Sequence, residues 1–390
     1  MTDTSNSRRK IDHLVGAHTL WKNGLSNGFD EVHFIHNALP ETYVNQIDTH
    51  TSFLGGGIDY PFMITAMTGG HPDLAPINRI LGEIAAKYNI PVEVGSQRMA
   101  VEDPALIETF AAIRENAPNA FIIGNIGVVQ LIEATDPLEI VDTCIEMISA
   151  NAISIHLNSM QELFQLEGTS NFNGALAKIQ DVAKNARVPV IVKEVGGGIS
   201  GPVAGQLENA GVSAINVAGY GGTNFNQIEF NRQQQNGKQN RTIDSDSEPP
   251  NLPPWGDLLQ WGIPTVVSLR WVRNHTSLPI IGSGGVRSGV DLAKTISLGA
   301  TIGGICGALL PALFSQGIPP FEEGQTKEIM QACVQYIDQF ILQFKITMAG
   351  LGCMKVEEMA TQPLVFFGTI KEWLENLGLF PDPRLPKCFT

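Results

Sequence analysis

The chain has 390 residues, of which 43% are hydrophobic and 16% charged, and 40 of them are glycine. This composition provides a large buried core and suits a single α/β barrel with extensions. The formal net charge of −14 repels a phosphate backbone, so we expect no nucleic-acid partner.

Three features of the sequence bear on the cellular compartment: the N-terminal segment, the longest apolar stretch and the cysteines. The first ten residues, MTDTSNSRRK, are polar and basic, without the apolar run of a signal peptide. The longest mostly apolar stretch, Thr301 to Phe314, is too short and glycine-rich to span a bilayer. The five cysteines are scattered and form no CxxC pair, which favours reduced thiols. We expect a cytoplasmic protein with no membrane partner.

Eight short apolar runs recur along the chain, and their centres are continuously apolar, as in parallel strands covered on both faces. They lie at 61–65, 92–95, 120–125, 152–158, 188–195, 214–219, 279–285 and 302–307. The segments between them predict helices at 77–88, 104–115, 138–149, 175–185, 203–209 and 290–298. Residues 255–274 supply the helix before the seventh strand. This alternation predicts an α/β fold, a (β/α)₈ TIM barrel, forming a single domain over 1–390.

Two flanks and one insertion depart from the repeat. Residues 1–60 form an N-terminal extension, and residues 315–390 form a mainly helical C-terminal segment, neither with the look of a separate domain. Residues 233–254, between the sixth and seventh strands, are polar and proline-rich, which predicts a long surface loop.

Polar residues or glycines follow most of the strands. In barrels of this class the chemistry lies at the C-terminal rim of the strands, so these residues predict a site there. They are Thr65–Gly70, Gly95–Arg98, Asn125, His156–Asn158, Lys193, Gly219–Thr223 and Gly282–Arg287.

The seventh strand runs into Gly282–Gly285, and a helix is expected to begin near Ser288. Glycines let backbone N–H groups approach a phosphate, and a helix N-terminus favours negative charge. The eighth strand ends at Gly303–Gly307, and barrels often bind phosphate between the loops after strands seven and eight. We therefore predict a phosphate site here, to which Gly219–Thr223 can add donors. A glycine-rich packing turn is the structural alternative.

Lys193 and Asn125 each follow an apolar run. A lysine at a strand end can place its ammonium against the N1/C2=O edge of an isoalloxazine and stabilise negative charge in a reduced flavin. A salt bridge from Lys193 to Glu194 or another carboxylate is the structural alternative. Asn125 can hydrogen-bond the flavin ring, but a lone asparagine is more often a turn former.

Two basic segments are suited to an anionic ligand. Arg9 and Lys10 can close over an anionic substrate if the N-terminal segment is flexible, and a solvated charge run is the alternative. In the segment Gly95–Arg98, the Ser96 hydroxyl suits a flavin and the Arg98 guanidinium matches phosphate oxygens. An ordinary polar loop is the alternative there.

The segment after the fourth strand, HLNSMQE at 156–162, concentrates polar side chains at one strand end. Glu162 can hold Mg²⁺, which proteins typically bind through one or two carboxylates together with substrate phosphates. The chain has no HExxH motif or cysteine cluster, so a zinc site is not expected. His156 is equally suited to a purely structural role.

Together these motifs resemble the type 2, flavin-dependent isopentenyl-diphosphate delta-isomerases. Their order and spacing, over most of the chain, are much more specific than any single motif. The matching segments are RKIDHL at 9–14, TAMTGG at 65–70, GSQR at 95–98, Asn125, HLNSMQE at 156–162, Lys193, GYGGTNF at 219–225, GSGGVRSG at 282–289 and ICG at 305–307.

The resemblance implies a homo-oligomer, tetrameric or octameric, that uses FMN, Mg²⁺ and a reductant such as NADPH. It implies that FMN contacts Ala66, Met67, Thr68, Ser96, Asn125, Lys193, Thr223, Gly285, Val286, Arg287, Cys306 and Gly307. It implies that the diphosphate substrate contacts Arg9, Lys10, Ser96, Gln97, Arg98 and Gln161, and that Glu162 ligates Mg²⁺. The chain departs from the family at Cys306, where alanine is frequent, at Phe225, where tryptophan is common, and in the longer, more polar 233–254 loop.

The implied reaction converts isopentenyl diphosphate to dimethylallyl diphosphate by adding a proton at one carbon and removing one from another. In the family, reduced FMN is thought to supply the acid and base through N5 without net redox change. The protein orients the cofactor, anchors the diphosphate and excludes water. His156 and Gln161 are the candidate catalytic side chains, with His156 tuning or orienting the site rather than acting as the sole acid.

Two other functions share part of this pattern. A flavin-dependent 2-hydroxy-acid oxidoreductase would share the phosphate site and the lysine, but needs a histidine base after a late strand. The only late histidine, His275, falls in the helix-like segment before the seventh strand. The third hypothesis is a non-catalytic flavin- or phosphate-binding protein.

Overall fold

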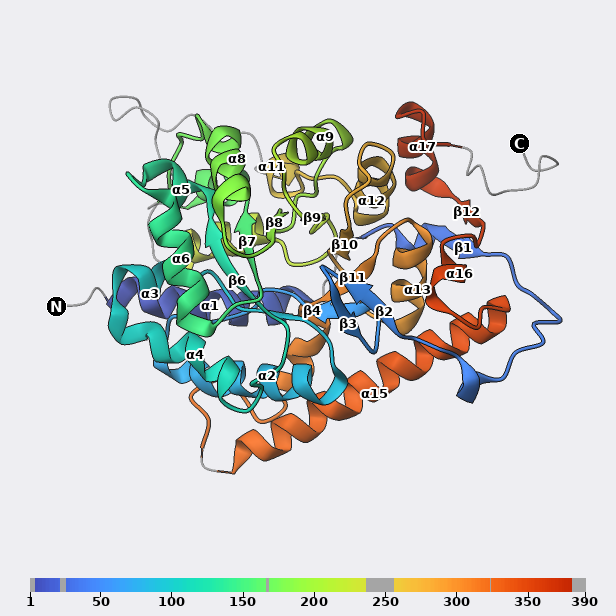
Figure 1. The fold of residues 1–390 in the computed structure, drawn as a ribbon, viewed down its shortest axis with the longest axis horizontal. Coiled ribbons are helices and arrows are strands. Elements are labelled where there is room, and N and C mark those ends of the chain that lie inside the picture. Colours follow the sequence, from blue (N-terminus) through green and yellow to red (C-terminus); the bar gives the residue numbers. More distant parts are fainter. Residues whose placement is uncertain (1–3, 22–25, 166–167, 236–255, 323, 381–390) are drawn as a thin grey trace.

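The computed structural model describes residues 4–21, 26–165, 168–235, 256–322 and 324–380 (Figure 1). Eight parallel strands close into a barrel in the order β10-β11-β4-β5-β6-β7-β8-β9. They are β4 (Phe62–Ile64), β5 (Val92–Glu93), β6 (Ile122–Gly127), β7 (Ala152–His156), β8 (Val190–Lys193), β9 (Ala214–Asn216), β10 (Ile280–Ser283) and β11 (Ile302–Ile305). Each of the eight predicted runs overlaps one strand, and β6 extends two residues beyond its run, so the (β/α)₈ prediction is confirmed.

Helices surround this barrel because each connection carries an apolar stripe that packs on the strands. Six of them overlap the six predicted helical segments: α2 (Ala75–Tyr88), α4 (Ile107–Glu115), α6 (Pro137–Ile148), α8 (Ala175–Asn185), α9 (Gly201–Asn209) and α13 (Gly289–Ser297). The predicted helix at 255–274 is split into α11 (Gly256–Leu259) and α12 (Thr265–Arg273). Additional helices after the strands are the short α3 (Arg98–Glu102), α5 (Val128–Glu133) and α7 (Ser159–Phe164), and the longer α10 (Phe225–Gln235). Short 3-10 helices are η1 (Phe29–Glu31), η2 (Val44–Gln46), η3 (Pro72–Leu74), η4 (Pro104–Leu106) and η5 (Gly307–Leu309).

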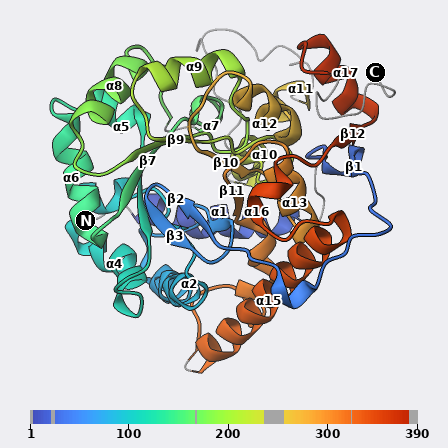
Figure 2. The same cartoon turned by 45° about the vertical axis from the view of Figure 1, so that its right-hand side comes forward.

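The N-terminal extension covers both ends of the barrel. A hairpin, β2 (Thr51–Phe53) with β3 (Gly56–Ile58), packs Phe53 and Ile58 against Met63, Ile123 and Ile281 of the barrel strands. This apolar plug closes the N-terminal end, and Figure 2 shows the hairpin at the centre of the ring of helices. Helix α1 (Thr4–Trp21) lies at the other end and packs on α10 and η5. The hairpin fills the N-terminal end of the barrel, whereas α1 lies over the C-terminal rim and leaves a cavity beneath it.

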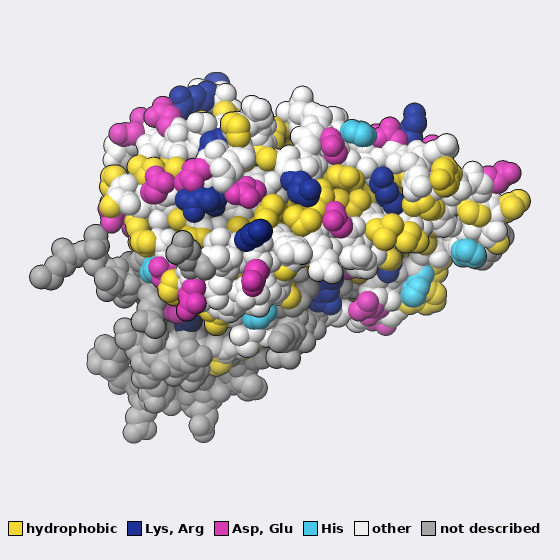
Figure 3. All heavy atoms as spheres, turned by 90° about the horizontal axis from the view of Figure 1, so that it is seen from below, with side chains coloured by type: hydrophobic (Ala, Val, Ile, Leu, Met, Phe, Trp, Pro, Cys, Tyr) yellow, Lys and Arg dark blue, Asp and Glu magenta, His cyan; other side chains and the backbone are white. Residues whose placement is uncertain are grey.

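The two flanks also pair with each other. Strand β1 (Val32–Phe34) runs antiparallel to β12 (Leu364–Phe366). The C-terminal segment is mainly helical, as predicted, with α14 (Leu310–Leu313), α15 (Gln325–Leu351), α16 (Val356–Met359) and α17 (Gly368–Asn376). Helix α15 packs along α13 and α2. On the face drawn in Figure 3, acidic, basic and apolar side chains are interspersed, and neither sign of charge dominates.

The predicted 233–254 loop is described only in part. Residues 233–235 of the predicted 233–254 loop belong to the end of α10, and the remainder lies outside the described residues. Within the described part of the chain, no helix is both long and apolar enough to cross a membrane.

Candidate active site

A large cavity opens at the C-terminal ends of the barrel strands, beneath α1. It is lined by every predicted site residue except Gln97 and Arg287. The predicted residues around it are Arg9, Lys10, Ala66, Met67, Thr68, Ser96, Arg98, Asn125, His156, Gln161, Glu162, Lys193, Thr223, Gly285, Val286, Cys306 and Gly307. The barrel topology brings them together because parallel strands present all their carboxyl ends at one rim.

One wall of the cavity is made of backbone. It comprises the loops after β9 and β10, and a Cβ added at Gly284 would lie 2.3 Å from the Gly219 carbonyl oxygen. Gly284 and Gly285 have φ of +108° and +76°, which glycine adopts freely. The Thr265 hydroxyl donates to the Gly284 carbonyl at 2.6 Å, and the Asn27 amide donates to the Gly285 carbonyl at 2.6 Å. With these carbonyls bonded behind the turn, the backbone of this wall is held in place, and the side chains that its loops add to the lining include Thr223 and Val286. We call it the glycine wall.

Arg287 corrects one expectation, because its side chain does not line the cavity. Its guanidinium donates to the Gly221 carbonyl at 3.2 Å, and its backbone N–H donates to Asp291 at 3.0 Å. Its own carbonyl accepts from the Tyr336 hydroxyl at 3.2 Å. Arg287 therefore fastens the loop after β9 to the start of α13, and it supports the glycine wall from behind.

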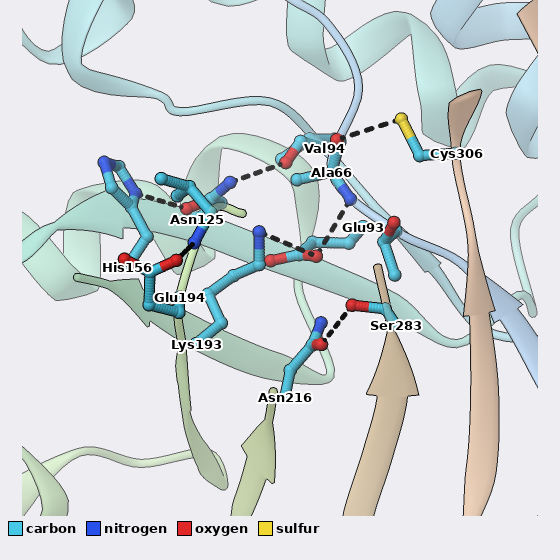
Figure 4. Close-up of polar contacts among 12 residues, drawn as sticks. Ala66, Glu93, Val94, Asn125, His156, Lys193, Glu194, Asn216, Ser283 and Cys306 are labelled. Atoms are coloured by element: carbon cyan, nitrogen blue, oxygen red, sulfur yellow. Dashed lines mark hydrogen bonds and ion pairs between the residues drawn. The ribbon is translucent and has the colours of Figure 1, made fainter. Parts of the chain in front are cut away.

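Lys193 and His156 rise from neighbouring strands at the floor of the cavity, since the two residues pair in register between β7 and β8. Burial, followed by the charges of Lys193 and Lys10, lowers the pKa of His156 to about 3. The imidazole is thus neutral at physiological pH. Its Nδ1 lies 2.9 Å from Asn125 Oδ1, while the Asn125 amide donates to the Val94 carbonyl at 3.1 Å (Figure 4). This network assigns the proton to Nδ1 and leaves Nε2 as an acceptor.

Gln97 corrects a second expectation. Its side chain is fully buried and points away from the cavity, where it donates to the Cys144 carbonyl at 2.9 Å. Its Oε1 accepts the Asn125 backbone N–H at 2.8 Å. Gln97 therefore ties the loop after β5 to β6 and α6, while its neighbours Ser96 and Arg98 face the cavity.

The wall opposite the glycines is built from side chains. Arg9 and Lys10 lie on α1 rather than on a flexible segment, and the Lys10 ammonium reaches the Ser96 carbonyl at 3.4 Å. Burial, followed by the charges of Arg9 and Arg98, lowers the pKa of Lys10 to about 7. Arg98, at the start of α3, is paired with Glu102 at 2.6 Å. These cations form what we call the basic wall.

Glu162, on α7, lines the same cavity, and we count it as the acidic member of the basic wall. Its carboxylate is 6% exposed and accepts from the Asn158 amide at 2.9 Å and from the Thr169 N–H at 3.2 Å. Gln161 is half-buried beside it on the cavity lining. Among the described residues, no group of three or more histidines, cysteines, aspartates or glutamates is placed to hold a metal ion. A cation at Glu162 would need further ligands from a bound anion.

Sequence reasoning missed an apolar part of the lining. Leu14 and Ala17 follow Lys10 on α1 at helical spacing, with the polar His13 between them and Lys10, and all of them line the cavity together with Leu310. The i, i+3, i+4, i+7 pattern from Lys10 to Ala17 was a usable signal. His13 is fixed by Glu229 of α10, 2.6 Å from its Nε2. This apolar strip adjoins the basic wall and provides space for a hydrocarbon chain attached to an anionic group.

Comparison with known proteins shows the family to which the chain belongs. A family model described as FMN-dependent dehydrogenase matches residues 141–365. A protein named isopentenyl-diphosphate delta-isomerase from Archaeoglobus fulgidus is 40% identical over 96% of this chain and 100% of its own length. Proteins of the same name from Methanosarcina acetivorans and Pyrococcus furiosus are 38% and 39% identical, over 98% and 94% of this chain and 98% and 89% of their own lengths.

The chain belongs to the FMN-dependent, type 2 isopentenyl-diphosphate delta-isomerase family, and it is an isomerase. The three matches cover 94–98% of this chain, so they include most of both flanks as well as the barrel. Among solved structures, a lactate oxidase from Pediococcus acidilactici matches with a TM-score of 0.60 at 15% identity, covering 94% of this chain and 95% of that one. A mandelate oxidase matches with a TM-score of 0.53 at 17% identity, covering 92% and 91%. At such identities the likeness shows the barrel fold alone.

Proposed function

We propose that this protein converts isopentenyl diphosphate to dimethylallyl diphosphate in isoprenoid biosynthesis, with reduced FMN, Mg²⁺ and NADPH as the reductant. The observation that carries the proposal is one cavity with two walls of different construction, each suited to an anion. The glycine wall suits the phosphate of a permanently held cofactor. The basic wall, with its adjoining apolar strip, suits a diphosphate that carries a short hydrocarbon chain.

The lining fits FMN on several counts. Gly219, Gly222, Gly284 and Gly285 line the cavity, and a Cβ added at any of them would lie within 2.7 Å of neighbouring protein atoms. Glycine is therefore what lets these loops pack so closely, and glycine-rich loops can present backbone N–H groups to a phosphate. The Thr68 hydroxyl is buried on the lining, with no hydrogen-bond partner among the described residues. It is therefore available to a polar edge of the flavin, and the Lys193 ammonium is available to the N1/C2=O edge. When bound, reduced FMN would supply the acid and base for moving the double bond.

The basic wall fits a metal-bound diphosphate. Asn158 Oδ1 is buried next to Glu162 and has no hydrogen-bond partner among the described residues. One carboxylate together with substrate oxygens is the ligand set that Mg²⁺ typically accepts. We assign Glu162 to the metal and Lys10, Arg9, Arg98, Ser96 and Gln161 to the diphosphate. These residues would hold the anionic end of the substrate in the same cavity as the flavin.

His156 serves this reaction as a neutral group. Because its pKa is lowered to about 3, it cannot donate a proton as an imidazolium at neutral pH. With Nδ1 held by Asn125, its Nε2 accepts one hydrogen bond from the bound ligands and orients them. We propose this positioning role for His156, and we propose that Gln161 on α7 likewise binds and orients the substrate through its side-chain amide.

A 2-hydroxy-acid oxidoreductase is the second candidate, favoured by the match to the FMN-dependent dehydrogenase family model. It requires a histidine base in the loop after a late strand. His275 instead follows α12, with its Nδ1 at 2.9 Å from the Trp271 carbonyl, and it is not on the cavity lining. The lining histidines among the described residues are His13 on α1 and His156 on β7. This placement favours the isomerase.

The proposal is tested with the FMN-loaded protein, reduced anaerobically by dithionite or NADPH, and given Mg²⁺ with isopentenyl diphosphate. We expect dimethylallyl diphosphate to form over many turnovers while the flavin spectrum stays reduced. Glu162→Gln should abolish the dependence on Mg²⁺ along with most of the rate. No product from the reduced holoenzyme, or flavin reduction by a 2-hydroxy acid, would sink the proposal.

We also propose the homo-oligomeric state, tetramer or octamer, and the cytoplasmic location that the resemblance and the sequence imply. Light scattering of the purified protein tests the first, and fractionation of the source cells tests the second. A monomer, or a protein in the membrane fraction, would contradict them.

A further inference from the structure

Glu93 is a buried carboxylate that the proposed chemistry does not use. It ends the short strand β5, is 1% exposed, and lies below the cavity lining rather than on it. Its Oε2 accepts the Ala66 backbone N–H at 2.9 Å and lies 3.9 Å from the Lys193 ammonium. Its Oε1 has no hydrogen-bond partner among the described residues.

Glu93 and Lys193 form a pair of opposite charges of which only Lys193 is exposed to the cavity. Lys193 lines the cavity and Glu93 does not. Figure 4 shows the two side chains facing each other. Opposite charges this close in a buried site interact strongly, because little water screens them. A negative charge behind the ammonium weakens the positive potential that the ammonium projects into the cavity.

The Cys306 thiol, at the cavity edge, responds to both charges. Burial raises the pKa of Cys306 to about 12, while the charge of Lys193 lowers it and the charge of Glu93 raises it further. Cys306 and Glu93 also share Ala66, since the thiol lies 3.6 Å from the carbonyl of the residue whose N–H Glu93 accepts. The two charges thus act in opposite directions at a group that lines the site.

We infer that Glu93 is a positioning residue that holds Lys193 and partly neutralises it, and thereby keeps the reduction potential of the bound FMN low. The inference rests on the proposed placement of the flavin against Lys193. Two-electron reduction places negative charge at the N1/C2=O edge, and a bare ammonium would favour it. With Glu93 behind the ammonium, that preference is smaller, and the reduced cofactor is the stronger electron donor.

Two matched substitutions separate charge from structure. Glu93→Gln removes the charge but keeps the length and the acceptor for the Ala66 N–H. Glu93→Asp keeps the charge but shortens the side chain, so it weakens that hydrogen bond. The measurement is the two-electron midpoint potential of the FMN holoenzyme, taken by anaerobic dye-linked titration, together with the thermal melting of each variant.

We expect Glu93→Gln to favour the reduced flavin by about tenfold, which is an upward shift of about 30 mV for a two-electron couple. Glu93→Asp should stay close to the wild-type potential. An unchanged potential in Glu93→Gln, or a larger shift in Glu93→Asp than in Glu93→Gln, would overturn the inference. A wild-type protein that binds no FMN would instead overturn the proposed function.

If Glu93→Gln does not fold, the same comparison can be made in a second background. Lys193→Gln should lower the potential, because Glu93 is then unopposed. The double variant with Glu93→Gln should raise the potential again, above that of Lys193→Gln and below that of the wild type. Equal potentials for the single Lys193→Gln and the double variant would overturn the inference.

Discussion

The two walls of the cavity bind anions by different means. The glycine wall presents backbone around Gly284 and Gly285, held from behind by Thr265, Asn27 and Arg287. The basic wall presents side chains from α1, α3 and α7, including an ammonium whose pKa is lowered to about 7. Backbone N–H groups do not titrate, whereas lysine and carboxylate side chains do. The difference suggests a cofactor held constantly at one wall and a substrate held in a pH- and metal-dependent way at the other.

The largest effect is expected from closing the glycine wall. In Gly284→Ala, the new Cβ would meet the Gly219 carbonyl oxygen at 2.3 Å at a φ of +108°. Steric strain of about 3 kcal/mol would weaken FMN binding by roughly 100-fold, as measured by fluorescence titration. Gly317→Ala is the matched control, because Gly317 has a φ of +105° but open space around it. Equal FMN affinity in the two variants would contradict the glycine-wall account.

The next effect concerns Lys10 and pH. Because the pKa of Lys10 is lowered to about 7, its side chain is positively charged below that pH and neutral above it. In the free enzyme, kcat/KM for the diphosphate should therefore fall as pH rises through about 7. Below about pH 7, Lys10→Ala should lower kcat/KM by about 10- to 100-fold, which corresponds to the loss of one charged hydrogen bond. The falling limb of the pH profile, in which kcat/KM decreases as pH rises, should be absent from this variant.

Lys10→Arg is the control for that assignment. Arginine stays protonated across the accessible range, so the falling limb should move to higher pH while the charge is kept. A limb that stays in place in Lys10→Arg would show that another group titrates.

A smaller effect is expected at His156, which acts as one neutral hydrogen-bond acceptor. His156→Gln should lower kcat by about fivefold, since a neutral hydrogen bond contributes about 1 kcal/mol. The pH dependence of kcat should keep its shape, because the pKa of His156 lies near 3 and outside the working range. Disappearance of an ionisation near neutral pH in this variant would mean that His156 is the acid after all.

The smallest effect on activity is expected at Gln97, the member of GSQR that faces away from the cavity. Gln97→Leu leaves the Cys144 carbonyl and the Asn125 N–H without their partner. Urea unfolding should show a loss of about 1–3 kcal/mol, while KM for the diphosphate changes little. A large rise in KM at unchanged stability would place Gln97 in the basic wall.

The strands and the rim could be predicted because their signals are local. Each barrel strand is an apolar run, and polar or glycine residues follow it directly, so topology alone gathers them. The side-chain directions of Gln97 and Arg287 could not be predicted, because they depend on partners such as Cys144 and Gly221 that are distant in sequence. Glu93 was hidden for a related reason, since it lies inside an apolar run and only the barrel brings it to Lys193.

The N-terminal segment gives the complementary case. Arg9 and Lys10 were identified as ligands from their charge, but their support was expected to be flexible. The structure instead has α1, fixed by the contact between His13 and Glu229. That contact joins residues 216 positions apart, beyond the reach of a local pattern.

The most direct test of two separate anion sites is a competition between FMN and inorganic pyrophosphate with Mg²⁺. The FMN-loaded protein is titrated with Mg²⁺-pyrophosphate, and both the flavin retained after ultrafiltration and the bound pyrophosphate are measured. The two-wall account predicts that pyrophosphate binds without releasing FMN, and that Lys10→Ala weakens pyrophosphate binding alone. Release of FMN in proportion to the pyrophosphate bound would contradict it, because both would then occupy one site.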